Sequence, residues 1–328
     1  MWLTAAAAAA GAVLTSLVSP WPAAMVIRAL FERDASRTRV EMARHDPGSA
    51  VRETLDIPYG TGGPRTRLDV FSPPDPGGPL PTVVWIHGGA WISGDKADVR
   101  PYVRRLASEG FTTIAVSYPL APERTYPASV RSLNDALAHI VEHATELRVD
   151  PSRIVLGGDS AGANLASQLA TATTDRRYAD DIGLQPALAA GQLRGVVLNC
   201  GIYDVRGVPE ARGLGGWGFR VALWAYLGRR VGRSSGQHLA DHEMSTLERV
   251  TPDFPPAWIS GGNGDPLTTK QSKALAARLD ELGVESTVLF YPDDLVPALP
   301  HEYQFHLDLP AARDAYASTV AFLRRVLR

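Results

Sequence analysis

From Val51 to the C-terminus the chain alternates short β-rich segments with helical ones, and this alternation constrains its fold more than any other feature. Strands joined by helical crossovers form a mostly parallel central sheet with helices on both faces. The expected strands are 53–59, 66–72, 82–86, 112–118, 153–158, 195–199, 256–262 and 286–291. The expected helices are 97–109, 128–147, 161–173, 269–282 and 309–327. The pattern therefore predicts one α/β domain over residues 51–328.

A glycine-flanked serine lies at one of the strand-to-helix junctions. The pentapeptide GDSAG, residues 158–162, joins the strand 153–158 to the helix 161–173. In this setting the pattern G-x-S-x-G carries a nucleophilic serine. The glycines leave room where a Cβ would collide, and the helix aims its first N–H groups at a developing oxyanion. We therefore predict that Ser160 is a nucleophile; a glycine-lined turn with a capping serine is the alternative.

A second glycine-rich loop follows the buried strand 82–86. It has the sequence HGGAW and begins at His87, and its glycines let the backbone come close to a substrate carbonyl. We predict that the N–H groups of Gly88 and Gly89 join that of Ala161 in an oxyanion hole. His87 is expected to organise the loop rather than to act as a base. A plain strand-to-helix turn is the alternative.

The segments HGGAW, YPLAPERTYPAS at 118–129 and GDSAG occur in this order, and together they resemble the hormone-sensitive-lipase-like branch of the α/β-hydrolases. The resemblance covers about Val51 to the C-terminus. It implies the α/β-hydrolase fold, with a cap built from the N-terminal segment and an insertion after the sixth strand. The chain departs from the family pattern at Ala90, where glycine is commoner. The additional methyl group argues against activity on bulky esters of tertiary alcohols.

The resemblance also implies an acid and a base that follow Ser160 in the order Asp and then His. Asp265 lies in NGDPL at the end of the strand 256–262, and His301 lies in LPHEY after the last strand. Their spacings of 105 and 36 residues resemble those of the family. His301 would remove the proton from Ser160, and Asp265 would orient and stabilise the imidazole. The rival residues are Asp204, Asp293 and Asp294 for the acid and His306 for the base.

The N-terminal segment is apolar, and no charged residue occurs from Trp2 to Ile27. Residues 2–19 form an apolar run at the lower limit for crossing a bilayer, and basic residues begin only at Arg28. We predict membrane association through residues 2–27, and otherwise a cytoplasmic protein; if the segment spans the bilayer, the basic residues after it place the rest of the chain on the cytoplasmic side. The alternative is an apolar helix that packs over the chain's own pocket.

Residues 1–50 and the insertion at about 201–256 are expected to form the cap over the site. Trp217 and Trp224 lie in the insertion, and Trp91 ends the glycine-rich loop. Aromatic side chains supply apolar walls for an acyl chain. We predict that these three tryptophans line a hydrophobic pocket for short- to medium-chain acyl esters. The alternative is that they only pack the cap against the body.

Composition excludes several other classes of protein. The net charge of −2 argues against a nucleic-acid partner. Cys200 is the only cysteine, which excludes an intramolecular disulfide and a multi-cysteine metal site.

Two histidine motifs resemble metal-binding patterns. The zinc-like pattern HIVEH at 139–143 places its polar residues on the solvated face of a helix. The segment HLADHE at 238–243 lies in the irregular insertion. We expect neither a metal nor a cofactor.

Three functions follow from these features. The first is a serine carboxylesterase that hydrolyses a small-molecule ester through an acyl-enzyme on Ser160. The second is an amide or formamide hydrolase that uses the same triad. The third belongs to a different class, a non-catalytic ligand-binding protein on the hydrolase fold, and the candidate base His301 argues against it.

Overall fold

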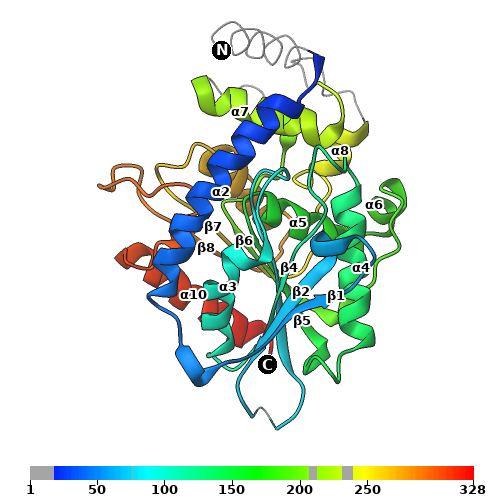
Figure 1. Cartoon of the computed structure of the whole chain (residues 1–328), viewed down its shortest axis with the longest axis vertical. Helices are drawn as coiled ribbons and strands as arrows, with labels where there is room; N and C mark the ends of the chain where they lie inside the picture. Colours follow the sequence, from blue (N-terminus) through cyan, green and yellow to red (C-terminus); the bar gives the residue numbers. More distant parts are fainter. Residues whose placement is uncertain (1–17, 76, 207–212, 231–238) are drawn as a thin grey trace, which may run out of the picture.

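The computed structural model describes residues 18–75, 77–206, 213–230 and 239–328. An eight-stranded sheet crosses the molecule in the order β1-β2-β4-β3-β5-β6-β7-β8, with helices packed on both faces (Figure 1). The strands are β1 Arg52–Pro58, β2 Arg67–Ser72, β3 Leu80–Ile86, β4 Thr112–Val116, β5 Val149–Asp159, β6 Leu193–Asn199, β7 Ala257–Gly261 and β8 Ser286–Phe290. The pairs β1–β2 and β2–β4 are antiparallel and the other five described pairs are parallel, so the predicted mostly parallel sheet is confirmed.

The helices divide into two layers and a cap. The α-helices are α2 Trp21–Ala43, α3 Lys96–Ala107, α4 Ala128–Glu142, α5 Ala161–Thr174, α6 Arg176–Asp181, α7 Gly213–Leu227, α8 Leu239–Met244, α9 Lys273–Glu281 and α10 Pro310–Val326. Helices α4, α5 and α9 share one apolar core, and α3 and α10 share the core on the opposite face of the sheet. The helix expected at 269–282 begins instead with a π-helical turn, Thr268–Ser272.

The central strands are apolar on both faces because both layers of helices cover them. In β3, the residues from Val83 to Ile86 are all buried, and Trp85 has no exposed surface. Helix α5 is buried from Ala161 to Ala172, and its small residues let it pack closely against β5 and β6. The loops after β3, β5, β7 and β8 therefore start from a rigid platform.

Helix α2 forms part of a cap together with α7. It runs along one side of the molecule and meets α7 at the upper end (Figure 1). Arg28 ties α2 to the body, since its Nη2 atom donates to the carbonyl of Ala121 at 2.7 Å and to Glu123 Oε2 at 2.6 Å. The two proposed cap segments thus lie together. The division into residues 1–50 and 51–328 stays a prediction.

Among the described residues, no helix combines the length and the apolar character needed to cross a bilayer. Residues 2–17 of the segment predicted to associate with a membrane lie outside the described part of the chain.

Candidate active site

Ser160 occupies a tight turn between β5 and α5, with φ of 50° and ψ of −116°. A non-glycine residue pays about 1–3 kcal/mol for such a conformation, so surrounding contacts must hold it. The two flanking glycines allow those contacts. A Cβ on Gly158 would lie 2.5 Å from the carbonyl carbon of Gly162, and one on Gly162 would lie 2.0 Å from the carbonyl oxygen of Ile86. The backbone N–H of Ser160 donates to the carbonyl of Asn199 at 2.8 Å.

The structure brings Ser160, His301 and Asp265 together in one chain of hydrogen bonds. Nε2 of His301 lies 2.9 Å from the Ser160 hydroxyl, and Nδ1 lies 2.7 Å from Oδ2 of Asp265. The other carboxylate oxygen of Asp265 accepts the N–H of Leu267 at 2.9 Å. Since a carboxylate only accepts, Nδ1 carries the proton and Nε2 faces the serine as an acceptor.

The charge of His301 depends on opposing effects. Burial of the ring disfavours the imidazolium. The hydrogen bonds with Asp265 and Cys200 and the carboxylate of Glu302 together outweigh burial and raise the pKa of His301 well above its ordinary value. The site therefore stabilises the imidazolium, the form that a general base reaches after it has taken a proton.

The rival acids and the rival base have other partners or face solvent. The ion pairs are Asp204 with Arg206 at 2.8 Å, Asp293 with Lys273 at 3.3 Å and His306 with Glu41 at 2.9 Å. Asp294 is exposed. Of the candidates that the sequence left open, Asp265 and His301 are the ones hydrogen-bonded in line with Ser160.

One of the N–H groups predicted to form the oxyanion hole is already hydrogen-bonded within the protein. The N–H of Gly88 donates to Oδ2 of Asp159 at 2.7 Å, so it is not available to a substrate oxyanion. In the described ranges, no hydrogen bond occupies the N–H of Gly89, Ala90 or Ala161. The candidate oxyanion hole therefore consists of Gly89, Ala90 and Ala161. The prediction for Gly88 is corrected because the buried side chain of Asp159 folds back on the loop.

Ala90 takes a backbone conformation that favours glycine. Gly89, Ala90 and Trp91 have φ values of 105°, 51° and 61° in succession. The left-handed region costs a residue with a Cβ about 1–2 kcal/mol. The turn closes on itself, because the N–H groups of Ile92 and Ser93 both donate to the carbonyl of Gly89. This conformation explains why glycine would fit at position 90.

His87 lies beneath the loop as an organising residue. Its Nδ1 atom is 2.8 Å from the carbonyl of Gly88, so Nδ1 carries the proton, and its ring stacks on Tyr118 at 4.4 Å between centroids. Burial lowers the pKa of His87 to about 4, which keeps the ring neutral at pH 7.

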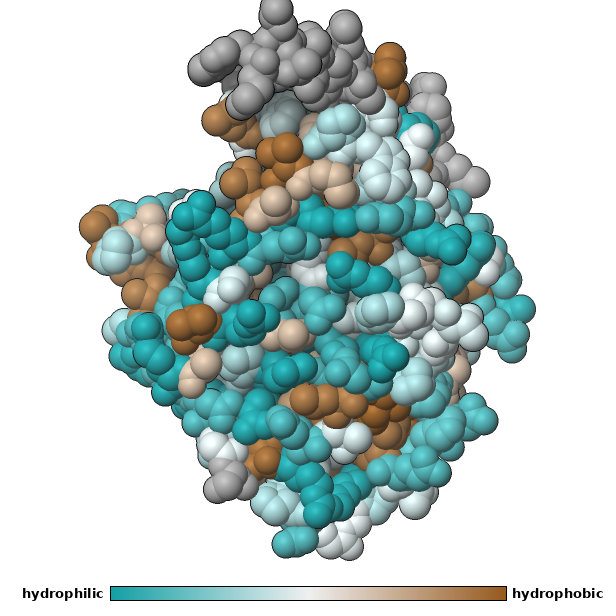
Figure 2. Space-filling view, in the orientation of Figure 1, coloured by the Kyte–Doolittle hydropathy of each residue, from teal (hydrophilic) through white to brown (hydrophobic). Residues whose placement is uncertain are grey.

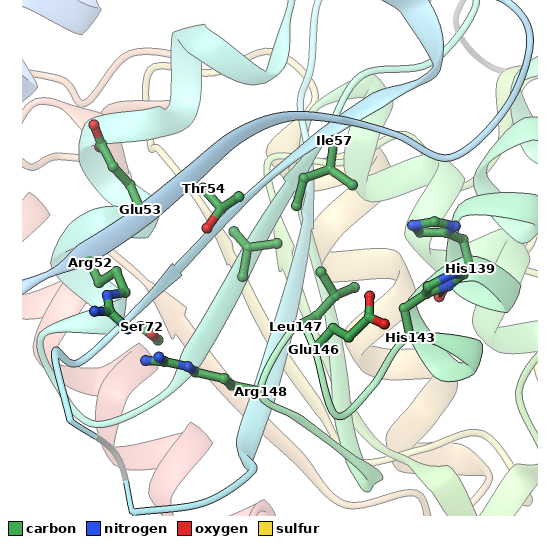
Figure 3. Close-up of a pocket in the computed structure, with 11 residues that line it drawn as sticks. Arg52, Glu53, Thr54, Ile57, Ser72, His139, His143, Glu146, Leu147 and Arg148 are labelled. Carbon is green, nitrogen blue, oxygen red and sulfur yellow. Dashed lines mark hydrogen bonds between the residues drawn. The ribbon is translucent and has the colours of Figure 1, made fainter.

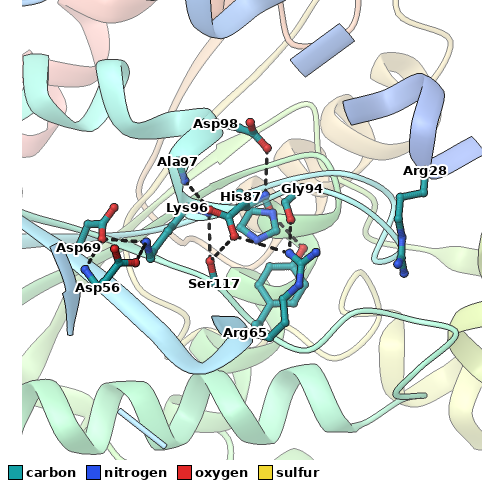
Figure 4. A network of polar contacts seen from close by, with 12 residues as sticks. Arg28, Asp56, Arg65, Asp69, His87, Gly94, Lys96, Ala97, Asp98 and Ser117 are labelled. Carbon is teal, nitrogen blue, oxygen red and sulfur yellow. Dashed lines mark hydrogen bonds and ion pairs between the residues drawn. The ribbon is translucent and has the colours of Figure 1, made fainter. Parts of the chain in front are cut away.

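A network of polar contacts lies beside the same loop (Figure 4). The Asp95 carboxylate accepts the N–H of Ala97 at 3.0 Å and the hydroxyl of Ser117 at 3.0 Å, and it caps α3. Lys96 Nζ lies 2.9 Å from Asp69 and 2.7 Å from Asp56. The start of α3, which directly follows the glycine-rich loop, is therefore held to β2 through Lys96 and Asp69.

A cavity of about 310 Å³ opens over Ser160. Its walls come from the glycine-rich loop, from the loops that carry Asp265 and His301, and from the two cap helices. The cap contributes Phe31, Asp34, Ala35, Thr38 and Met42 from α2 and Phe219 from α7. Helix α2 therefore forms one wall of the cavity.

The three predicted tryptophans do not line this cavity. Trp91 has no exposed surface and stacks on Tyr226 at 5.2 Å between ring centroids. Trp217 is 45% exposed, and the guanidinium of Arg230 lies over the ring of Trp224 at 4.3 Å. Helix α7 is apolar on nearly all sides, so its sequence did not reveal which aromatic side chain faces inward. The aromatic lining is instead Phe31, Phe219 and Phe305.

Sequence reasoning also missed two acidic residues at the site. Asp159 has no particular role in the pentapeptide pattern, and Glu302 directly follows the candidate base. Both line the cavity, and Oε1 of Glu302 lies 3.6 Å from Nε2 of His301. The adjacency of His and Glu in LPHEY was the signal that could have identified Glu302.

A second cavity of about 590 Å³ lies at β1, β2 and the end of α4 (Figure 3). His139 and His143 of the zinc-like pattern stack there at 4.1 Å between centroids, and Arg52 and Arg148 lie on the other side. His238 of the other histidine pair lies outside the described residues.

Within the described ranges, three potential metal-ligating atoms converge only at Cys200, Asp265 and His301. Both ring nitrogens of His301 are already hydrogen-bonded there, to Asp265 and to Ser160. The free thiol of Cys200 is buried, and burial raises its pKa. These contacts describe a hydrogen-bonded triad with a neutral thiol beside it.

A protein-family model described as alpha/beta hydrolase fold matches residues 83–299. The chain belongs to this family. The resemblance found in the sequence is thereby confirmed, and the match includes the glycine-rich loop, the Ser160 turn and Asp265. His301 lies two residues beyond the matched range.

Two proteins of Mycobacterium tuberculosis illustrate the relationship. Esterase LipQ is 29% identical over 253 residues, which are 73% of this chain and 56% of the relative. Carboxylesterase NlhH is 33% identical over 266 residues, which are 79% of this chain and 77% of the relative. The chain spans about half the length of LipQ and of the probable carboxylic ester hydrolase LipM.

Solved structures agree with the fold. Esterase B from Lactobacillus rhamnosis has a TM-score of 0.79 at 24% identity, over 93% of this chain and 95% of that one. An esterase from Pyrobaculum calidifontis has a TM-score of 0.71 at 28% identity, over 92% of each chain. The shared architecture therefore extends over most of the chain.

Proposed function

We propose that the protein is a serine carboxylesterase. The observation that carries the proposal is the continuous hydrogen-bonded chain from Ser160 through His301 to Asp265, with spacings of 2.9 Å and 2.7 Å. The names of LipQ and NlhH, an esterase and a carboxylesterase, support the same reaction.

The first half of the reaction forms an acyl-enzyme. His301 Nε2 takes the hydroxyl proton of Ser160 while Oγ bonds to the ester carbonyl carbon. Asp265 keeps the ring oriented and stabilises the imidazolium. As the tetrahedral intermediate collapses, the ester C–O bond breaks, and the proton on Nε2 passes to the departing alkoxide.

The second half returns the enzyme to its starting state. Water gives a proton to His301 Nε2 and attacks the acyl carbon, and the carbonyl oxygen again becomes an oxyanion. The N–H groups of Gly89, Ala90 and Ala161 stabilise that charge in both halves; each such donor is worth about 3 kcal/mol of barrier. The bond to Ser160 then breaks, and the proton returns to Oγ as the carboxylic acid leaves.

The cavity suits short- to medium-chain acyl groups. A volume of about 310 Å³ lies at the lower end of the range for small-molecule sites, and apolar side chains of α2 and α7 cover it. We expect kcat/KM to peak within this range along a series of p-nitrophenyl esters. Preference for long-chain triglyceride emulsions would contradict this part of the proposal.

Labelling with a fluorophosphonate tests the nucleophile directly. The wild-type chain should be labelled at Ser160, and Ser160→Ala should lose both labelling and ester turnover by a factor of about 10⁴ or more. His306→Asn is the matched control, since His306 contacts Glu41 and not the serine. Ester turnover that persists in Ser160→Ala would contradict the assignment of Ser160 as the nucleophile of the triad.

The same triad can cleave an amide, so the substrate panel includes an aryl formamide beside the esters. Faster turnover of the formamide would move the assignment to the amide hydrolases. Binding of esters without turnover by the wild-type chain would favour the ligand-binding hypothesis.

Membrane association of the N-terminal segment is a further part of the proposal. Apolar side chains gather over α2 and α7 at the upper end of the molecule (Figure 2). Val18, Trp21, Val26 and Leu30 are exposed there by 79%, 46%, 60% and 60%. Exposed apolar side chains that include a tryptophan favour binding at a membrane interface. The test is co-sedimentation with lipid vesicles, which Trp21→Ser and Val26→Ser together should reduce. Unchanged co-sedimentation of this double variant would contradict membrane association.

A further inference from the structure

The cavity over Ser160 has an acidic lining. Asp34, Asp98, Asp159, Asp265 and Glu302 all contribute to its walls. No lysine or arginine is among the described residues that line it. An ester needs no charged partner, so the carboxyl groups other than that of Asp265 are not explained by the hydrolysis alone.

Three of the five carboxyl groups are compensated locally. Asp265 is hydrogen-bonded to His301. Asp98 lies 3.4 Å from Arg39 and accepts the backbone N–H of Asp95. Asp159 is fully buried. It accepts the N–H of Gly88 at 2.7 Å and the indole N–H of Trp85 at 2.9 Å, and burial and the neighbouring Glu302 raise its pKa well above its ordinary value.

Asp34 and Glu302 are the two remaining carboxyl groups. In the part of the chain that the structure describes, neither of them forms an ion pair with a lysine or an arginine. Glu302 is 31% exposed and lies beside the base, whereas Asp34 is an exposed residue of α2. Phe31 precedes Asp34 by three residues and lines the same wall, which adds an aromatic face beside the carboxylate.

We infer that the cavity selects esters whose alcohol part carries a positively charged ammonium group, with Glu302 and Asp34 as the residues that set this specificity. The inference rests on the proposed esterase activity and names the substrate class of the same site. Two carboxylates in a cavity with low-dielectric walls attract a cation, and an aromatic ring beside them favours an alkylammonium.

The geometry assigns the cation to the alcohol rather than to the acyl chain. The leaving alkoxide takes its proton from Nε2 of His301, so the ester oxygen must lie beside that atom. Oε1 of Glu302 is 3.6 Å from Nε2. Substituents on the leaving oxygen therefore pass close to the Glu302 carboxylate.

The carboxylates that attract a cation also repel anions. An ester that already carries a carboxylate on its alcohol part would be repelled on entry. Hydrolysis also creates a carboxylate from every ester, and the acidic lining favours the departure of that product.

Three esters of matched size test the inference on the full chain. They are butyrylcholine, its uncharged isostere 3,3-dimethylbutyl butyrate, and a carboxylate-terminated ester, 4-(butyryloxy)butanoate. We expect kcat/KM to be about tenfold higher for the cation than for the isostere and lowest for the anion. The cation-to-isostere ratio should fall as sodium chloride rises from about 20 mM to about 500 mM, because salt screens the partly exposed carboxylates.

Two variants locate the effect. Glu302→Gln and Asp34→Asn should each lower the cation-to-isostere ratio about threefold. Because the ratio compares two substrates on one enzyme, a change in the basicity of His301 cancels from it. Glu32→Gln, which removes an exposed charge of α2 outside the cavity, is the matched control and should leave the ratio unchanged.

The outcomes separate this inference from the proposed function. If no ester is hydrolysed, the proposed function fails. If kcat/KM for the uncharged isostere equals that for butyrylcholine, and both variants leave the ratio unchanged, the charge selectivity is wrong. The proposed esterase activity then still stands. If only Asp34→Asn keeps the ratio of the wild type, Asp34 is removed from the specificity residues.

Discussion

At the scale of single residues, Glu302 and Asp159 decide how the site is charged. A Cβ on Gly88 would lie 2.3 Å from Oδ2 of Asp159 and 2.8 Å from Oε1 of Glu302, so the two acidic side chains meet beneath the oxyanion loop. Asp159 also accepts the indole N–H of Trp85 at 2.9 Å. Burial and Glu302 raise the pKa of Asp159, and Oε1 of Glu302 lies 3.6 Å from Nε2 of His301.

This arrangement predicts the pH dependence of the reaction. Only the neutral imidazole of His301 can accept the serine proton, so kcat/KM should rise as pH rises through the pKa of His301. Because that pKa is raised well above 6.5, the acid limb should lie above pH 6.5. Glu302→Gln removes a charge that stabilises the imidazolium and should move the acid limb to lower pH.

The measurement is kcat/KM for a neutral ester between pH 5 and pH 9 in steps of half a unit. Glu41→Gln, which removes a carboxylate that pairs with His306 instead, serves as the comparison and should keep the wild-type profile. An acid limb that stays in place in Glu302→Gln would rule out a direct effect of this carboxylate on His301.

At the scale of elements, the ion pairs that Lys96 and Arg100 form with Asp69 hold α3 against β2. Lys96 is 5% exposed and Asp69 is fully buried, and Arg100 is the second partner of Asp69 at 2.8 Å. Removal of one partner from a buried pair leaves an uncompensated charge. The junction between β2 and α3 therefore depends on complete pairing.

Lys96→Met should lower the free energy of unfolding by about 3 kcal/mol, since Asp69 would retain only Arg100. Urea denaturation followed by circular dichroism measures the change. Lys273→Met removes a partly exposed lysine whose partner Asp293 is 85% exposed, and it should cost less than about 1 kcal/mol. Equal losses in the two variants would show that burial of these ion pairs is not what makes them stabilising.

At the scale of the whole molecule, α2 is a cap element attached to the body at two places. Arg28, two turns into the helix, binds the carbonyls of Ile92 and Ala121 and the side chain of Glu123. Near the C-terminal end of the helix, Glu41 pairs with His306 at 2.9 Å. Because this helix forms a wall of the cavity, its attachment controls the shape of the substrate site.

Arg28→Ala should raise KM for a medium-chain ester about tenfold with a smaller change in kcat, because a hydrogen bond to a charged group contributes about 1.5–3 kcal/mol. The thermal midpoint should change little, since the core of the sheet does not include this contact. Arg33→Ala, an exposed arginine of the same helix, is the control. A fall in kcat with no change in KM would place Arg28 outside substrate binding.

Much of the architecture follows from local patterns. Apolar β-rich segments that alternate with helical ones indicate the sheet, and the strand-glycine-serine-glycine-helix order indicates the Ser160 turn. These are local signals, because the period of a segment and the steric freedom of glycine depend on the residues themselves. The order of Ser160, Asp265 and His301 could likewise be inferred from the family resemblance.

What the sequence by itself determined is therefore the fold class and the residues that the structure brings into one hydrogen-bonded chain. Tertiary structure alone decided which N–H groups stay free, since Asp159 reaches the N–H of Gly88 across 71 positions of the chain. It also decided that Phe31 and Phe219, rather than the tryptophans, line the cavity. The physical reason is the same in both cases: hydrogen-bond partners and inward-facing side chains are selected by the packing of elements that are distant in sequence.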